Sequence, residues 1–139
     1  MNRQDGFSLT ELMMTVAIMG ILGMVGYPSY LDHVQRSNRN DARSAVSRAA
    51  NDLERFFATN GTYTTDVTTT SLTIDGGEAF SDDANYKVTI TAGATGNIAT
   101  SYRVTATAHG SQANDSDCTT MSLDSAGTRV PTPATSRCW

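Results

Sequence analysis

The fold of this chain is decided by residues 6–28, whose sequence is GFSLTELMMTVAIMGILGMVGYP. From Phe7 to Tyr27 the run is almost entirely apolar, and it stops at Pro28. Such a run is long enough, with tilt, to cross a hydrocarbon core of roughly 30 Å. One acid, Glu11, interrupts it, and a charge in lipid costs about 2.5–3.5 kcal/mol even on a lenient insertion scale. The segment therefore predicts more than an anchor, because Glu11 needs a partner.

Three interpretations of this N-terminus compete. A secretory signal peptide is loosely matched, but no A-x-A-like cleavage site follows Gly26. A plain signal anchor leaves Glu11 unexplained. In the third interpretation, processing occurs between Gly6 and Phe7, and the apolar segment stays on the mature protein. We favour the third because it explains the position of the acid.

The junction formed by residues 6–12, followed by an apolar run, resembles the class III leader junction of type IV pilins and the related pseudopilins. The resemblance implies that a dedicated membrane peptidase cleaves after Gly6 and methylates the new amine of Phe7. Glu11 then becomes the fifth mature residue, and Pro28 takes the place of the family's helix-kinking proline. Family leaders are usually basic, whereas here Arg3 is offset by Asp5.

Electrostatics agrees with this resemblance. After cleavage, Phe7 would carry a protonated amine about one helical turn from Glu11. Opposite charges in an apolar filament core attract strongly and are poorly screened. Pairing Glu11 of one subunit with the Phe7 amine of a neighbour would neutralise both charges and set the axial stagger. An intrahelical pair within one subunit is the alternative, and both arrangements can occur at different stages of assembly.

Beyond Pro28, apolar residues recur at helical spacing, which predicts one long helix from about Phe7 to Ala58. The turn signal Asn60-Gly61 should end it. Phe56 and Phe57 are expected to close the bottom of a core. The polar positions of this helix predict a charged outer face, made of Asp32, Arg36, Arg39, Asp41, Arg43, Arg48, Asp52, Glu54 and Arg55.

The second half of the chain contains segments in which apolar and polar residues alternate, as they do in strands. Residues 62–83 predict a long surface connection with one short strand. Alternating apolar and polar residues predict strands over 86–91 and 102–108. A third strand is expected around Met121 and Leu123, and a short final one near Arg129-Val130, before Pro131 and Pro133 lead a loop back to Cys138. We therefore predict an α+β fold, an antiparallel meander laid against a helix.

The two cysteines, Cys118 and Cys138, lie near the end of the chain. A membrane-inserting N-terminus predicts an oxidising compartment and a disulfide between them, with two free thiols as the alternative. Residues 118–129 and Cys138-Trp139 resemble the PilE-like minor pilins of the type IVa class. The resemblance implies a pilin fold, in which the hydrophobic half of a long N-terminal helix protrudes from a small sheet with a disulfide-closed C-terminal loop.

This organisation gives three expected regions. Residues 1–6 form a leader peptide, 7–30 a hydrophobic transmembrane and filament-core helix, and 31–139 a globular pilin head with a helix and an antiparallel sheet.

The sequence also argues against several functions. A net charge of −4 and a pI near 4.9 are unlike a nucleic-acid-binding surface, which needs a basic stripe. His33 and His109 have no metal-ligand spacing, and no nucleophile motif or phosphate-binding loop occurs. The acids of 115–117 and of Asp82-Asp83 could ligate calcium, but we expect solvated loop acids. We therefore predict no enzyme, no cofactor and no metal.

The expected function is that of a structural subunit of a type IV pilus. Within that class we favour a minor pilin needed for pilus assembly, twitching motility and attachment. A major pilin is the near alternative, and a type II secretion pseudopilin a more distant one; a membrane-tethered ligand-binding or enzymatic domain is a different class. The expected partners are other pilin subunits, the prepilin peptidase, an inner-membrane assembly platform and membrane lipid, but no nucleic acid. The chain should cross the inner membrane once, with a periplasmic head, and then enter an extracellular pilus.

Overall fold

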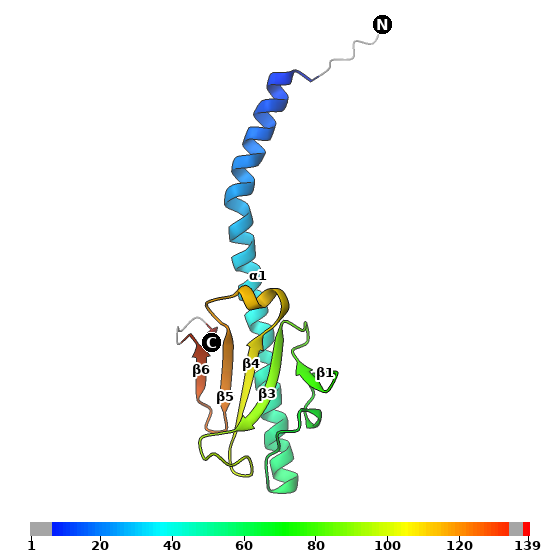
Figure 1. Ribbon diagram of the computed structural model, residues 1–139, viewed down its shortest axis with the longest axis vertical. Coiled ribbons are helices and arrows are strands. Elements are labelled where there is room, and N and C mark those ends of the chain that lie inside the picture. Colours follow the sequence, from blue (N-terminus) through cyan, green and yellow to red (C-terminus); the bar gives the residue numbers. More distant parts are fainter. Residues whose placement is uncertain (1–6, 134–137) are drawn as a thin grey trace. The chain divides into compact units, whose positions relative to one another are not determined.

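A computed structural model describes residues 7–133 and 138–139 of the chain (Figure 1). One long helix, α1, comes first and a six-stranded sheet follows. The elements are α1 (Leu9–Asn60), η1 (Val67–Thr69), β1 (Thr73–Asp75), β2 (Glu78–Phe80), β3 (Tyr86–Ala92), β4 (Tyr102–Ala108), η2 (Gly110–Asn114), β5 (Thr120–Asp124) and β6 (Arg129–Thr132).

Residues Gln35–Trp139 form one compact unit, which we call the head unit. Its sheet has the strand order β1-β2-β3-β4-β5-β6, and every neighbouring pair is antiparallel. Each strand therefore pairs with the next one along the chain, as short turns allow. The C-terminal half of α1 runs along one face of this sheet (Figure 1). The predicted α+β meander on a helix is confirmed.

The core lies between that half of α1 and the inner face of the sheet. Small residues at helical spacing let the strands approach the helix closely, and the sheet fills the space with larger side chains. From α1 the core takes Ala42, Ala45, Val46, Ala49, Ala50 and Leu53; from the sheet it takes Ala79, Tyr86, Val88, Ile90, Tyr102, Val104, Ala106 and Met121. The alternation of buried and exposed residues along β3 and β4 explains why their positions could be predicted.

Helix α1 ends at the predicted turn signal. Gly61 has a φ of +70° and its amide donates to the Phe57 carbonyl oxygen at 2.8 Å, as a glycine after a helix end does. The prediction that Phe57 closes the core is wrong, because this side chain is 37% exposed. Its ring stacks instead on Tyr63, with centroids 4.5 Å apart. Phe56 is only half-buried.

The connection between α1 and β3 is more ordered than its composition predicts. One short strand was expected there, but β1 and β2 form a hairpin in which Asp75 pairs with Glu78. The two residues between them, Gly76 and Gly77, have φ values of +58° and +84°. A two-residue hairpin turn needs positive φ at its central positions, which glycine adopts without strain. The strands are short and polar, and so their alternation was too weak to predict.

At the other edge of the sheet, β6 is longer than expected. Pro131 does not begin a loop but pairs with Met121 of β5. An edge strand tolerates proline because one side of the strand needs no ladder hydrogen bond.

Candidate functional site

The N-terminal part of α1, which belongs to a separate unit ending at Val34, carries the apolar run. An 18-residue window of the helix has a mean hydropathy of 1.8, and none of it is buried. By length and composition this is a helix able to cross a membrane. Its large side chains from Phe7, which is 88% exposed, to Leu31 are all exposed. A helix that is apolar all round needs lipid or other helices about it.

The first turn of α1 holds the predicted acid. Glu11 is exposed, and its Oε2 accepts a hydrogen bond from the Ser8 amide at 3.1 Å. Gly6, the predicted cleavage position, lies outside the described residues. The predicted roles of Gly6, Phe7 and Glu11 therefore remain predictions. Helix α1 continues through Pro28, and the predicted kink there also remains a prediction.

The predicted disulfide is present in the head unit. Cys118, which precedes β5, is joined to Cys138, and both are fully buried. The bond ties the last residues of the chain to the turn between η2 and β5. Arg43 of α1 adds to this attachment, because its Nε donates to the Cys138 carbonyl oxygen at 2.9 Å.

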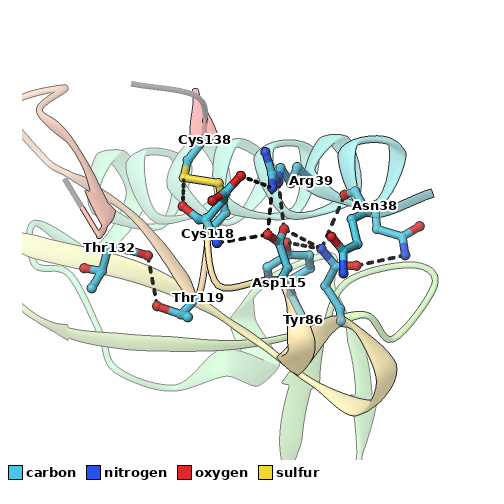
Figure 2. A network of polar contacts seen from close by, with 11 residues as sticks. Asn38, Arg39, Tyr86, Asp115, Cys118, Thr119, Thr132 and Cys138 are labelled. Carbon is cyan, nitrogen blue, oxygen red and sulfur yellow. Dashed lines mark hydrogen bonds and ion pairs between the residues drawn. A yellow bond between two sulfur atoms is a disulfide. The ribbon is translucent and has the colours of Figure 1, made fainter. Parts of the chain in front are cut away.

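A buried ion pair lies beside the disulfide (Figure 2). Arg39 of α1 donates two hydrogen bonds to Asp115, from Nε to Oδ2 at 2.7 Å and from Nη2 to Oδ1 at 2.6 Å. The side chains are only 6% and 1% exposed. Hydrogen bonding to Asp115 raises the pKa of Arg39, although burial alone would lower it. A bidentate pair of this kind has both strength and fixed geometry.

Two predictions are corrected here. Arg39 was expected on the charged outer face of the helix, and Asp115 was expected to be a solvated loop acid. Each instead supplies the charge that the other needs in order to be buried. A signal for Arg39 was available in the sequence, because it stands at the helical spacing of the buried residues Ala42, Val46 and Ala49.

Gln112 of η2 completes the network around Arg39 and Asp115. It is 1% exposed, and its Nε2 lies 2.9 Å from Asp115 Oδ2, 3.1 Å from the Tyr86 hydroxyl and 3.3 Å from the Gln35 carbonyl oxygen. Its Oε1 accepts from Asn38 Nδ2 at 3.1 Å. Burial raises the pKa of Tyr86. The network joins α1, β3, η2 and the disulfide-closed segment, and the sequence predicted none of its pairings.

The remaining candidate groups, Asp82, His33 and His109, are exposed. Asp82 pairs with Arg48 of α1, Nη2 to Oδ1, at 2.7 Å. The His109 ring lies against Phe80, with centroids 5.3 Å apart, and His33 is exposed. Within residues 7–133 and 138–139, no group of three or more His, Cys, Asp or Glu residues could hold a metal ion.

A second polar contact sits at the far end of α1. The Tyr102 hydroxyl donates to Glu54 Oε1 at 3.0 Å, and the Tyr63 hydroxyl reaches the same carboxylate at 3.2 Å. The rings of Tyr63 and Tyr102 meet edge to face, with centroids 4.9 Å apart. Burial, and then the hydrogen bond to Glu54, raise the pKa of Tyr102. These contacts hold the start of β4 against α1, and Phe57 stacks on the outer side of Tyr63.

Two family comparisons together cover residues 1–122. Residues 28–122 match the family described as type IV minor pilin ComP, DNA uptake sequence receptor. Residues 1–27 match the prokaryotic N-terminal methylation motif. No curated protein matches the chain significantly.

A solved structure agrees with the family comparison. The structure of a type IV pilin from Shewanella oneidensis is similar, with a TM-score of 0.53 and 27% sequence identity, over 76% of this chain and 97% of that one. The apolar N-terminal helix and the methylation motif fit a membrane-anchored pilin that later joins a pilus. The chain is a structural subunit of a pilus and belongs to the type IV minor pilin family.

Proposed function

We propose that this minor pilin is cleaved between Gly6 and Phe7, methylated on the Phe7 amine, and built into the pilus through the apolar part of α1. The observation that carries the proposal is the exposed apolar N-terminal part of α1, which has one acid, Glu11, in its first turn. An apolar helix exposed all round is stable in lipid and in a bundle of like helices, so one segment can serve both stages.

The proposed regions follow from this sequence of events. Residues 1–6 are removed, 7–30 hold the subunit in the inner membrane and then form the filament core, and 31–139 form the periplasmic head. Tyr27 and Tyr30, both exposed, are placed to mark the membrane–water boundary, where tyrosine is enriched. The prepilin peptidase and the inner-membrane assembly platform are the proposed partners before assembly.

Intact-mass analysis of the membrane-purified protein tests the processing step. The mature chain should lack Met1–Gly6 and carry one methyl group on Phe7. An unprocessed Met1, or a mature chain that begins after Gly26, would contradict the proposal.

In the filament, Glu11 of one subunit pairs with the Phe7 amine of another. Replacing Glu11 with Ala should leave membrane insertion intact and strongly reduce recovery of the subunit in sheared pili, because the amine then lacks its counter-charge. Met14→Ala, in the same exposed apolar segment, is the matched control. Normal incorporation of the Glu11→Ala variant would count against the pairing.

The proposed role is a structural one that supports twitching motility and attachment, without catalysis. Subunit stoichiometry in purified pili separates this role from that of a major pilin: a minor pilin is a small fraction of the subunits. A chain that makes up most of the filament mass would show that the major-pilin alternative holds.

The family description names a receptor for a DNA uptake sequence, and we do not extend that role to this chain. A DNA surface needs a basic stripe. Residues 56–86 hold Asp66, Asp75, Glu78, Asp82 and Asp83 without a single Lys or Arg, and the whole chain has a net charge of −4. Fluorescence anisotropy with labelled duplexes should show no binding tighter than about 10⁻⁵ M at physiological salt. Sequence-selective submicromolar binding would overturn this proposal.

A further inference from the structure

The start of α1 has the pattern of a helix cap. Ser8 precedes the first helical residue, and its carbonyl oxygen accepts the helical hydrogen bond from the Leu12 amide at 3.2 Å. Ser8 is therefore the N-cap residue, and Glu11 stands three positions later. A Ser followed three residues on by Glu is a capping box, in which the Glu side chain bonds back to the N-cap amide.

The structure contains this half of the capping box. The Ser8 amide donates to Glu11 Oε2 at 3.1 Å, while the Ser8 hydroxyl lies 2.6 Å from Thr10 Oγ1. We propose that Glu11 has a second role, separate from its charge: it caps the first turn of α1 in the membrane-inserted subunit. This inference rests on the proposed function, because it concerns Glu11 before and after assembly.

The hydrogen bond of the cap stabilises the helix more in lipid than it would in water. The first amides of a helix have no partner within the helix, and in a bilayer no water replaces one. Glu11 is likewise costly in lipid unless it is hydrogen-bonded. The bond from Ser8 serves both groups at once. The subunit can therefore hold its acid in the membrane before any neighbouring subunit arrives.

The cap also prepares the carboxylate for assembly. A carboxylate can accept several hydrogen bonds through its two oxygens, and the Ser8 amide takes one position on Oε2. Oε1 can then accept from the Phe7 amine of a neighbouring subunit. The Ser8 amide thus positions the acid, and the added amine completes its coordination without breaking the cap.

The test separates capping from charge by comparing two substitutions at Glu11. Gln has an acceptor oxygen and is found in capping boxes, so Glu11→Gln keeps the cap and loses the charge. Glu11→Ala loses both. Amide hydrogen exchange at Ser8 is measured in the processed, full-length protein in detergent micelles. Neither substitution alters the residues adjacent to that amide, so a change in rate reports the hydrogen bond.

The Ser8 amide should exchange about fivefold faster or more in Glu11→Ala, and at close to the wild-type rate in Glu11→Gln. Thr15→Ala is the matched control. It removes the bond from the Thr15 hydroxyl to the Leu12 carbonyl oxygen at 2.8 Å, one turn further on, and should leave the Ser8 amide unchanged. Both Glu11 variants should fail to enter the pilus.

The outcomes distinguish this inference from the proposed function. Equal Ser8 exchange in wild type and Glu11→Ala would overturn the cap, whatever happens in the filament. Fast Ser8 exchange in Glu11→Gln as well would also overturn the cap, since the side-chain oxygen of the glutamine would then fail to accept the bond from Ser8. Normal pilus entry of Glu11→Gln, with slow Ser8 exchange, would overturn the charge pair and leave the cap standing.

Discussion

Replacing Asp115 with Ala should be among the most damaging single substitutions in the head unit. It deletes both acceptors of the two short Arg39 hydrogen bonds, at a place where only 6% of the Arg39 side chain is exposed. The guanidinium then keeps only the longer contact to Asp117 Oδ2 at 3.5 Å, and the Asp117 side chain is 60% exposed, so that it compensates little. Removing one partner of a buried ion pair costs about 3–5 kcal/mol, because the other charge stays buried and unpaired. Gln112 Nε2 also loses a partner at 2.9 Å. We expect a loss of about 4 kcal/mol in the free energy of unfolding.

Urea unfolding of the full-length protein in detergent micelles, with the disulfide intact, measures this loss. Trp139 is the single tryptophan of the chain and packs against the core, so its fluorescence reports the head unit. With a urea slope of about 1.5 kcal/mol/M, the midpoint should fall by about 2.7 M. A fall of less than about 0.7 M, equivalent to about 1 kcal/mol, would refute the reasoning, since it would mean that Arg39 does not depend on Asp115.

Two further variants make the result specific. Glu78→Ala removes an ion pair with Lys87 in which both side chains are more than a third exposed, and it should cost no more than about 1 kcal/mol. The double variant Arg39→Met with Asp115→Leu removes both charges together. It should be more stable than Asp115→Ala, because no orphan charge remains. If the double variant is no more stable than Asp115→Ala, the loss comes from the missing Asp115 contacts with the backbone and with Gln112, and not from an unpaired charge.

Three more predictions concern the same head unit. Replacing Cys118 and Cys138 with Ser opens a loop with a sequence separation of 20 and should cost about 3 kcal/mol in the same urea assay; reduced wild type should lose a similar amount, and no loss in either would contradict it. Because the pKa of Tyr102 is raised in the folded state, its neutral phenol contributes fully to the free energy of unfolding below about pH 10. This contribution is lost as pH rises through the pKa of the folded state. Burial also raises the pKa of Tyr86, so ultraviolet titration should show more than one phenol ionising above pH 10, and Tyr102→Phe should remove one of these steps; unchanged titration in that variant is the opposing result. Replacing Gly93 with Ala puts a Cβ 2.6 Å from the Tyr102 carbonyl oxygen, so the melting temperature should fall with a loss of about 1–3 kcal/mol, and an unchanged melting temperature would show that the turn relaxes freely.

Much of the fold could be predicted because it depends on local patterns. The apolar run of 7–27 and the spacing beyond Pro28 predict one long helix, and the alternation over 86–91 and 102–108 predicts the central strands. These signals depend only on which neighbours along the chain face the same way. The short polar strands β1 and β2 lack such a signal, and only their turn glycines pointed to a hairpin.

The sequence by itself determined the apolar N-terminal helix and the order of helix and strands, because hydropathy and turn chemistry act between near neighbours. Only the tertiary structure decided which charges are buried. Arg39 and Asp115 are 76 residues apart, and whether each meets water or the other depends on how η2 and the disulfide-closed segment pack on α1. Phe57 is the opposite case, an aromatic residue that is exposed. It stands at the end of a buried helical face, but Tyr63 and Tyr102 pack there and Phe57 lies outside the core. Burial is a property of the packed assembly of elements, and for that reason it cannot be assigned from one segment alone.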